Sequence, residues 1–256
     1  MLDRLTAGAA QDAWQRRAVH PLAEVEAAAA ARTPALDALE ALRPADRVKV
    51  IAEIKRASPS RGPLAAIPDP AALAVSYQTG GASAISVLTD RRNFQGSLAD
   101  LEAVRDAVAV PVLRKDFISQ PYQVLEARAA GADIVLLIVA ALDQPTLSSL
   151  HELVGELGMT ALVETHSADE ISRALDVGGA LIGVNARDLN TFELDQNLFG
   201  SLADRIPSGV IRVAESAVKA PADVAHYRAA GADVVLIGEA LVSGDPILTL
   251  TGFLAA

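Results

Sequence analysis

The stretch Arg128-Ala-Ala-Gly-Ala-Asp133, which runs directly into the apolar sequence Ile-Val-Leu-Leu-Ile at 134–138, occurs twice in this chain. The second copy is Arg228-Ala-Ala-Gly-Ala-Asp233, which runs into Val-Val-Leu-Ile at 234–237. Each copy is typical of the end of a helix, a glycine that terminates the helix, and a buried β-strand. We therefore assign these glycines a structural role and expect a fold built from repeated helix–strand pairs.

Short runs of Val, Ile and Leu alternate with helical stretches from about residue 48 onward. The predicted strands are 48–54, 84–88, 111–114, 134–139, 161–164, 181–184, 210–214 and 234–237. Strict alternation predicts parallel strands joined by right-handed crossovers. Eight such units in 256 residues predict an α/β fold, the (β/α)8 TIM barrel. A doubly wound open sheet is the alternative, but no glycine-rich dinucleotide loop follows the first strand.

Residues 1–45 precede the first predicted strand and are rich in alanine. Three apolar residues would form one stripe on a helix, at Leu2, Leu5 and Ala9. Prolines divide the segment into short helices, at Pro21, Pro34 and Pro44. The segment is too small for a second domain, so we expect one barrel domain over 1–256 with a helical N-terminal extension, 1–45, that caps one end.

The overall composition excludes several classes of function. Hydrophobic residues make up 51% of the chain and aromatic residues only 4%, which suits parallel strands buried on both faces. The net charge of −10 argues against a nucleic-acid partner or an anionic membrane surface, although a local pocket can still bind an anionic substrate. The longest apolar run, 134–142, is far shorter than the roughly 20 residues that span a bilayer. With Asp3 and no apolar signal segment at its start, the chain is expected to be a cytoplasmic enzyme.

Residues that commonly bind metals are few in this sequence. The chain has no cysteine, which excludes disulfides, thiolate chemistry and cysteine-based metal sites. Its four histidines show no metal-ligand spacing, and we interpret each as a surface or capping residue: His20, His151, His166 and His226. We therefore predict an activity without a metal or a cofactor.

Lysine is scarce, since only four of the 22 Lys and Arg residues are lysines. Arginine is effectively always protonated, whereas a buried lysine can shift its pKa and transfer a proton. Lys55 ends the apolar run Val-Ile-Ala-Glu-Ile-Lys, and Lys115 ends Val-Pro-Val-Leu-Arg-Lys. We interpret both as side chains that reach a pocket, with ordinary surface lysines as the competing interpretation.

Polar residues gather where the predicted strands end, which is where barrel enzymes place their sites. Alternation with a period of two puts Glu53 and Lys55 on one face of the first strand. In the same way, Glu164 lies on the same strand face as Leu162, and Glu215 lies on the same strand face as Val213. If these faces point into the barrel, three carboxylates and two ammonium groups meet at one rim and can carry out acid–base catalysis. Further polar residues follow the first, sixth and seventh strands, at Ser58, Asn185, Arg187 and Ser216, and Gly238 ends the eighth strand.

A phosphate site is indicated after the last two strands. Ala214-Glu-Ser-Ala217 follows the seventh strand, and Gly238-Glu-Ala240 opens a short helix after the eighth. Loops at these places commonly hold a phosphate group. Ser58-Pro-Ser-Arg-Gly62 in the first loop adds hydroxyl and backbone donors for the same anion.

Five ordered segments resemble the signature segments of the indole-3-glycerol-phosphate synthase family, and the resemblance covers nearly the whole chain. They are Ala52-Glu-Ile-Lys-Arg-Ala-Ser-Pro-Ser60, Leu113-Arg-Lys-Asp-Phe117, Ala161-Leu-Val-Glu-Thr-His166, Ile182-Gly-Val-Asn-Ala-Arg-Asp-Leu189 and Ala214-Glu-Ser216. The resemblance implies a cofactor-free carboxy-lyase that converts 1-(2-carboxyphenylamino)-1-deoxyribulose 5-phosphate into indole-3-glycerol phosphate in tryptophan synthesis.

The resemblance also implies roles for single residues. Lys115 would be the acid for ring closure, Lys55 and Glu53 would transfer protons in dehydration, and Glu164 would be a further proton-transfer or electrostatic group. Which lysine acts at which step stays open. The sugar and the catalytic groups would be positioned by Asn185, Glu215 and Ser216. The phosphate would be held by Ser58, Ala217, Gly238 and Glu239. The ring pocket would comprise Phe94, Phe117, Leu136, Ile138, Arg187 and Leu189, with plain core packing as the competing interpretation for Leu136 and Ile138.

Two positions depart from the family pattern. Ala186 stands where the family usually has a second Asn, so a side-chain hydrogen bond is lost there. Ala217 stands where the family usually has Gly. If that position requires a positive φ, alanine costs about 1 kcal/mol or more. We expect instead that the loop adjusts so that Ala217 avoids this conformation.

Two other classes of function compete with this interpretation. Another phosphate-binding barrel is one, such as a Schiff-base aldolase, which borohydride would trap, or phosphoribosylanthranilate isomerase, which would release no carbon dioxide. A non-catalytic barrel is the other, and the intact acid–base set argues against it. For partners we expect a small phosphorylated substrate, no nucleic acid, no membrane, and a monomer.

Overall fold

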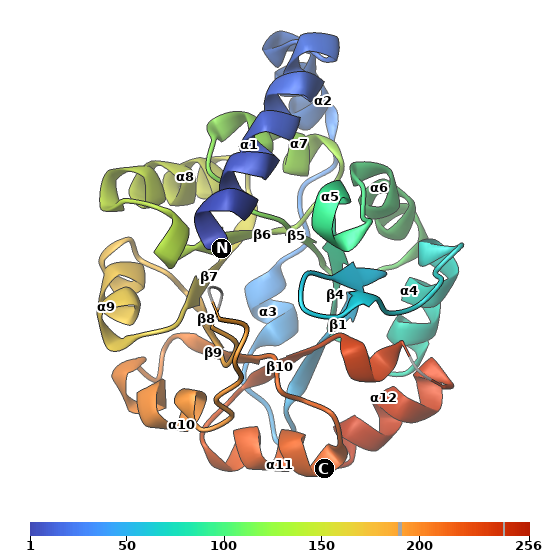
Figure 1. Ribbon diagram of the computed structural model, residues 1–256, viewed down its shortest axis with the longest axis vertical. Helices are drawn as coiled ribbons and strands as arrows, with labels where there is room; N and C mark the ends of the chain where they lie inside the picture. Colours follow the sequence, from blue (N-terminus) through green and yellow to red (C-terminus); the bar gives the residue numbers. More distant parts are fainter. Residues whose placement is uncertain (189–190, 243) are drawn as a thin grey trace.

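The computed structural model describes residues 1–188, 191–242 and 244–256. Within them, eight parallel strands close into a barrel in which β1 pairs with both β4 and β10 (Figure 1). The strands are β1 Lys49–Ile54, β4 Ala84–Leu88, β5 Val112–Lys115, β6 Ile134–Ile138, β7 Thr160–Thr165, β8 Leu181–Asn185, β9 Ile211–Glu215 and β10 Val234–Ile237. The predicted (β/α)8 barrel is confirmed, with every predicted strand boundary within one residue of the observed one.

Helices lie between consecutive strands and surround the barrel. They are α4 Pro70–Thr79, α6 Leu98–Ala107, α7 Pro121–Ala129, α8 Gln144–Glu156, α9 Ala168–Asp176, α10 Leu198–Leu202, α11 Pro221–Ala229 and α12 Pro246–Leu254. Side chains cap several of them, as where Asp69 accepts from Ala72 N and Ser97 from Asp100 N. The repeated glycines Gly131 and Gly231 adopt φ angles of 91° and 94° after their helices, as a terminating glycine requires.

Side chains of each strand alternate between two cores. The core inside the barrel contains Ile51, Leu113, Leu162 and Val213. The core between strands and helices contains the next residues along, such as Ala52 and Val163. The predicted faces are therefore correct, and the charged residues two positions after Ile51, Leu113, Leu162 and Val213 point along the barrel axis toward its C-terminal rim.

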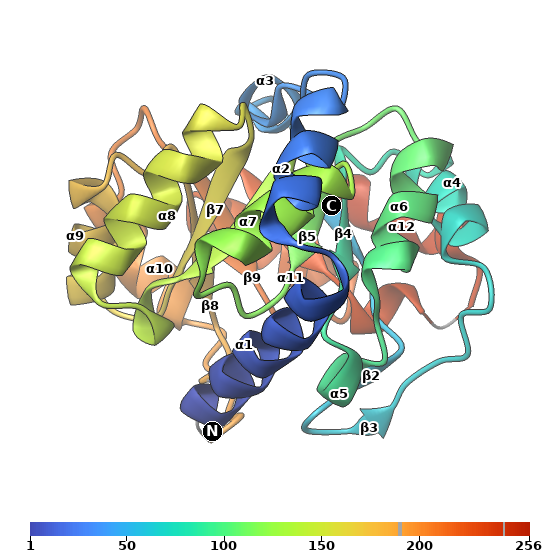
Figure 2. The same ribbon diagram turned by 90° about the horizontal axis from the view of Figure 1, so that it is seen from above.

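The N-terminal segment forms α1 Leu2–Val19, α2 Leu22–Ala31 and α3 Ala38–Leu42. The stripe of Leu2, Leu5 and Ala9 is buried as predicted. The segment does more than cap one end: α3 closes the N-terminal end of the barrel, and the start of α1 reaches the opposite, C-terminal rim (Figure 2). Between these ends, α2 packs along α7.

Short elements that the sequence did not predict gather mainly at the C-terminal rim (Figure 2). They are the hairpin of β2 Ala57–Ser58 and β3 Gly62–Pro63, then α5 Arg91–Phe94, and the 3-10 turns η1 Val139–Ala141 and η2 Ala203–Arg205. The short helix predicted after the eighth strand is present as the 3-10 turn η3 Glu239–Leu241. None of the described helices has the length and apolar character needed to cross a membrane.

Candidate active site

A cavity of about 290 Å³ opens at the C-terminal rim of the barrel. The structure places every predicted site residue that it describes on the wall of this cavity. Leu189, also predicted, lies outside the described residues. The strands bring these side chains together because the carboxyl ends of all eight meet at one rim.

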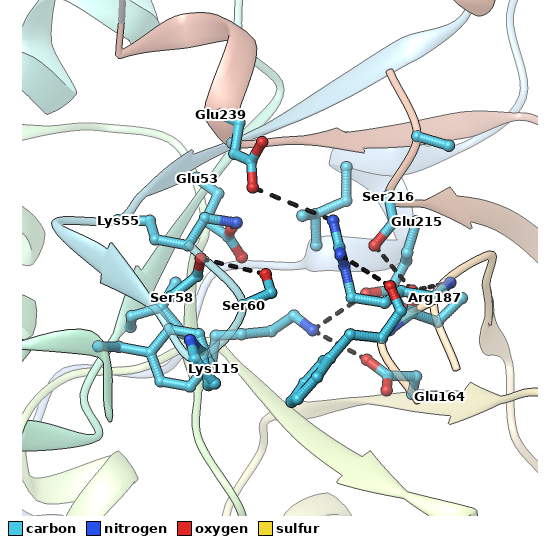
Figure 3. A pocket seen from close by; sticks show the side chains of 18 of the residues that line it. Glu53, Lys55, Ser58, Ser60, Lys115, Glu164, Arg187, Glu215, Ser216 and Glu239 are labelled. Carbon is cyan, nitrogen blue, oxygen red and sulfur yellow. Dashed lines mark hydrogen bonds and ion pairs between the residues drawn. The ribbon is translucent and has the colours of Figure 1, made fainter. Parts of the chain in front are cut away.

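Lys115 lies at the centre of the charged groups (Figure 3). Its Nζ donates to Glu164 Oε2 at 2.9 Å and lies 3.1 Å from Glu215 Oε2. These residues end β5, β7 and β9, so three separate strands supply one ion-pair cluster. Both carboxyl groups are almost completely buried. Lys115 itself keeps only 13% of its side chain exposed.

Burial and charge give these groups distinct protonation states. Burial alone would lower the pKa of Lys115, but Glu164, Glu215 and Glu53 outweigh it and hold that pKa well above its usual value. Burial would raise the pKa of Glu164, yet Lys115 and His166 lower it to about 2. Burial raises the pKa of Glu215 to about 8, with Lys115 opposing and Glu164 adding to the rise. Near neutral pH the cluster therefore holds an ammonium group, one carboxylate and one carboxylic acid.

The space for Glu215 depends on a glycine. A Cβ atom at Gly183 of β8 would overlap Glu215 Oε1, so only glycine leaves room for this carboxyl group. Apart from the ion pair with Lys115, neither oxygen of Glu215 has a hydrogen-bond partner in the described part of the chain. Burial and the nearby charge of Glu164 both favour the neutral form of this carboxyl group, in agreement with the raised pKa of Glu215.

Glu53 and Lys55 form a second charged pair on the other side of the cavity. Lys55 Nζ lies 2.7 Å from Glu53 Oε1. Gly238 packs directly against the pair, since a Cβ there would lie 2.5 Å from Glu53 Oε1 and 3.1 Å from Lys55 Nζ. The end of β10 thus comes close to the end of β1, and glycine is the residue that permits this approach.

Asn185 links the ends of β8 and β9. Its Oδ1 accepts from Ser216 Oγ at 2.8 Å and from Arg187 N at 3.0 Å. The substituted position Ala186 keeps its backbone role, because its N–H donates to Glu215 O and its carbonyl accepts from Asp195 N. The small side chain is buried.

The prediction for Ala217 is wrong. Ala217 adopts a φ of 59° and its neighbour Ser216 a φ of 69°, so the loop keeps the left-handed conformation instead of adjusting away from it. Two consecutive left-handed residues turn the chain sharply after Glu215, at the edge of the cavity. The turn itself therefore does not require glycine, but Ala217 carries the cost of a Cβ in this region.

The end of the cavity that was predicted to hold a phosphate contains more charged side chains than the sequence indicated. Glu239 lies between two arginines, 3.1 Å from Arg61 Nη1 and 4.0 Å from Arg187 Nη2 (Figure 3). The guanidinium of Arg187 thus lies beside Glu239 and donates to Phe192 O, away from the apolar ring pocket to which it was assigned. Ser58 and Ser60 face each other nearby, with their Oγ atoms 3.5 Å apart.

An apolar wall faces the charged cluster. Phe94 and Phe117 contact each other with ring centroids 6.2 Å apart. Leu136 and Ile138 of β6 lie in the same core inside the barrel and also line the cavity, so they serve both of the roles considered for them.

Several residues of the cavity wall were missed by sequence reasoning. They are Leu5 of α1, then Leu88, Asp116, Phe192, Leu194, Val218, Lys219, Leu236 and Ile237. Pro59, Ser60 and Arg61, which belong to the segment 58–62 predicted to contribute donors for the phosphate, also lie on the wall. The apolar stripe of α1 pointed to burial of Leu5, but nothing in the sequence pointed to its contact with the site. The interpretation of His166 as a surface or capping residue is also wrong, because only 15% of its side chain is exposed and its ring lies beside Glu164.

The chain matches known proteins over nearly its whole length. The family profile described as indole-3-glycerol phosphate synthase matches residues 2–249. The chain is 72% identical over 253 residues to the indole-3-glycerol phosphate synthase of Leifsonia xyli subsp. xyli, covering 99% of this chain and 97% of that protein. It is 58% identical over 247 residues to that of Rhodococcus jostii, covering 96% and 91%. The chain is also 54% identical over 257 residues to the indole-3-glycerol phosphate synthase of Beutenbergia cavernae, and the match covers 100% of this chain and 95% of that protein.

Solved structures show a similar fold at low sequence identity. The thiamine phosphate pyrophosphorylase of Pyrococcus furiosus has a TM-score of 0.61 and 13% identity, covering 80% of this chain and 93% of that one. The N-acetylmannosamine-6-phosphate 2-epimerase of Clostridium perfringens has a TM-score of 0.61 and 14% identity, covering 82% and 93%. These likenesses concern the fold alone. Since the family profile spans nearly the whole chain and relatives are more than half identical to it, the chain belongs to the indole-3-glycerol phosphate synthase family.

Proposed function

We propose that the cavity converts 1-(2-carboxyphenylamino)-1-deoxyribulose 5-phosphate into indole-3-glycerol phosphate with release of carbon dioxide and water. The observation that carries this proposal is the position of Lys115, whose ammonium group lies between Glu164 and Glu215 and opposite an apolar wall. An aromatic ring against that wall presents its reacting carbon to a protonated group. This is the arrangement that ring closure onto a ketone needs.

The two ends of the cavity suit the two ends of this substrate. The aryl ring would pack on Phe94, Phe117, Leu136 and Ile138, where burial of apolar surface stabilises it. The phosphate would lie at the opposite end, near Ser58, Ala217 and Gly238 and within reach of the arginines around Glu239. With both ends fixed, the ketone lies between the two lysines.

Ring closure needs a proton at the ketone oxygen. The ring carbon that bears the carboxylate attacks the ketone carbon, and the electron pair of the carbonyl bond moves to oxygen. Lys115 would donate its proton to that oxygen. The raised pKa of Lys115 keeps it protonated near neutral pH, and the developing alkoxide is a far stronger base than Glu164 or Glu215. Loss of carbon dioxide then returns the electrons of the carboxylate bond to the ring, which becomes aromatic again.

Dehydration needs an acid at the new hydroxyl group and a base at the neighbouring carbon atom. The new hydroxyl group leaves as water after it accepts a proton, and the neighbouring carbon loses a proton to form the double bond of the indole. Lys55 and Glu53 lie 2.7 Å apart and would supply these two functions. Ser216 and Asn185, which hydrogen-bond each other, would position the sugar hydroxyl groups.

We propose in addition that the chain acts as a monomer in the cytoplasm. The predicted acid–base groups that the structure describes all meet in the cavity of a single chain, which supports a monomer as the active unit. Light scattering during gel filtration, with activity measured across the peak, tests the monomer. Activity confined to a dimer fraction would contradict it.

The experiment that tests the activity is incubation of the full chain with the carboxyphenylamino-deoxyribulose phosphate. We expect indole fluorescence to appear together with carbon dioxide in equal amounts. Conversion without carbon dioxide would indicate an isomerase, and a lysine adduct trapped by borohydride would indicate an aldolase. Either result, or no conversion, rejects the proposal.

A further inference from the structure

His166 lies directly behind the catalytic cluster. It follows β7, two residues after Glu164, and does not reach the wall of the cavity. Its Nε2 lies 3.6 Å from Glu164 Oε1, the oxygen that faces away from Lys115. Glu164 therefore lies between two basic groups, with Lys115 on one oxygen and His166 on the other.

The two facing atoms, His166 Nε2 and Glu164 Oε1, share one property. Both His166 Nε2 and Glu164 Oε1 are buried, and neither has a hydrogen-bond partner within the described residues. A buried polar atom without a partner is costly. A small approach of the two groups would satisfy both atoms at once, which indicates that the ring is directed at this carboxyl group.

The other side of the imidazole is held in place by Glu170. Glu170 Oε2 accepts from His166 N at 2.8 Å and lies 3.3 Å from His166 Nδ1. Glu170 belongs to the first turn of α9, where its own N–H donates to the N-cap residue Ser167. The helix terminus thus fixes the carboxylate, and the carboxylate fixes the ring.

We propose that His166 is a positioning residue, held by Glu170, that keeps Glu164 as the ionised partner of Lys115 and confines the remaining proton to Glu215. The idea rests on the proposed function, in which Lys115 donates a proton. It adds that two otherwise similar carboxyl groups are made unequal by an imidazolium on one side only. Lys115 then always pairs with the same carboxylate, and its ammonium group keeps one direction.

The charges around His166 support this arrangement. The carboxyl groups facing it come from β7 (Glu164), α9 (Glu170) and β9 (Glu215), and the positive group beyond them is Lys115 of β5. Burial alone would lower the pKa of His166, but Glu170, Glu164 and Glu215 outweigh it and raise that pKa above its usual value. The imidazolium is therefore favoured more than in an ordinary histidine, and its charge contributes to the low pKa of Glu164.

The test removes the positive charge at residue 166 and keeps a side chain of similar shape. His166→Gln retains an amide N–H near the position of Nε2 but cannot become positive. Carboxyl groups labelled with carbon-13 at Cδ are titrated by NMR without substrate, with Glu164→Gln used to assign the signal. We expect the pKa of Glu164 to rise by on the order of one unit, since a nearby opposite charge typically shifts a carboxyl group by about 1–3 units. The acid limb of the kcat profile should move to higher pH with it, while KM changes little.

Matched variants separate this role from a structural one. Glu170→Gln keeps the acceptor for His166 N but removes the negative charge, and should shift the Glu164 signal in the same direction by less. His151→Gln on α8, away from the cavity, should leave the titration and the kcat profile unchanged. A lower Tm in His166→Gln with an unchanged Glu164 titration would overturn the proposal.

A direct measurement on the unmodified protein covers the case in which His166→Gln does not fold. The nitrogen-15 titration of the imidazoles should give His166 a higher pKa than His151, whose pKa is lowered by burial. A His166 that titrates below His151 would contradict the proposal. Because both titrations need no substrate, they also separate a failure of this inference from a failure of the proposed reaction.

Discussion

At the scale of single residues, Ala217 shows how a loop can keep a conformation that its side chain opposes. An L-residue in the left-handed region costs roughly 1–2 kcal/mol, whereas glycine there costs only its extra unfolded-state entropy of about 0.4–1 kcal/mol. With φ at 59°, Ala217→Gly should therefore stabilise the protein by about 0.5–1 kcal/mol in urea unfolding. The exposed helical Ala103→Gly, as a control, should destabilise it by about 1 kcal/mol. Equal destabilisation by both variants would contradict the assigned backbone strain.

The pH dependence of protein stability tests whether Glu215 is held in its neutral form in the buried charge cluster. Its folded-state pKa is raised to about 8 from an ordinary value of 4.5. The contribution of Glu215 to stability is therefore fully present below about pH 4.5 and is lost as the pH rises through about 8. Glu215→Gln cannot ionise, so the Tm of this variant should rise relative to that of the unmodified protein as the pH increases from about 4.5 to about 8. A difference in Tm that does not change with pH would show that Glu215 is not held in its neutral form.

The catalytic candidates could be predicted from residue types and their positions in the sequence. The backbone conformations and side-chain directions around the site could not. Scarcity and position singled out Lys55 and Lys115, because a lysine at the end of a buried strand must reach a pocket. The backbone of Ala217 and the direction of the His166 ring depend on loops whose geometry no periodic pattern specifies. For His166 one signal was present, a glutamate four residues later at the start of a predicted helix.

At the scale of elements, β8 has to leave space for its neighbour β9. Gly183 pairs with Val213 in the sheet, and a Cβ on Gly183 would overlap the carboxyl group of Glu215. We expect Gly183→Ala to displace Glu215 from Lys115 and to lower kcat by roughly 10²-fold, at the low end of the effect of an acid–base group. Single-turnover kinetics measures the loss.

A glycine without this constraint provides the control for Gly183. Gly155 lies in α8, and a Cβ there would have no atom within 4 Å. Gly155→Ala should leave kcat unchanged and raise stability by up to about 1 kcal/mol, since alanine favours a helix. If Gly183→Ala were as active as Gly155→Ala, the close fit of Glu215 against β8 would have no part in catalysis.

The long elements were predictable because short apolar runs alternate with helical stretches along the chain. The strands 134–138 and 234–237 are such runs, as expected for strands buried on both faces. The hairpin β2–β3 and helix α5 are too short for a period to appear. They form the rim of the cavity, so the sequence predicted the barrel better than the edge that binds substrate. This is why the ion pair of Arg61 with Glu239 was not predicted.

At the scale of the whole molecule, the N-terminal segment and the barrel hold each other together. Arg16 of α1 makes two hydrogen bonds, of 2.6 and 2.7 Å, to Glu126 of α7. Glu126 in turn lies 3.5 Å from the fully buried Arg114 of β5, next to Lys115. Leu42 of α3 is completely buried in the core inside the barrel. We propose on these contacts that residues 1–256 fold as one domain.

The single tryptophan allows this proposal to be tested. Trp14 lies in α1, so its fluorescence reports the N-terminal segment, whereas far-UV circular dichroism reports mainly the barrel. We expect both signals to change at the same urea concentration, as a cooperative unit requires. A Trp14 transition at clearly lower urea would show that the segment unfolds by itself. Arg16→Gln should move both midpoints together.

The central claim concerns the whole barrel, because closure of the sheet brings Lys115, Glu164 and Glu215 from three strands to one point. The most direct test is the single-turnover rate of Lys115→Arg, which keeps the positive charge but is a poor proton donor. We predict that the rate of ring closure falls by about 10²–10⁴, with substrate affinity and circular dichroism unchanged. A rate within a factor of about ten of the unmodified protein would contradict the assignment of Lys115 as the acid.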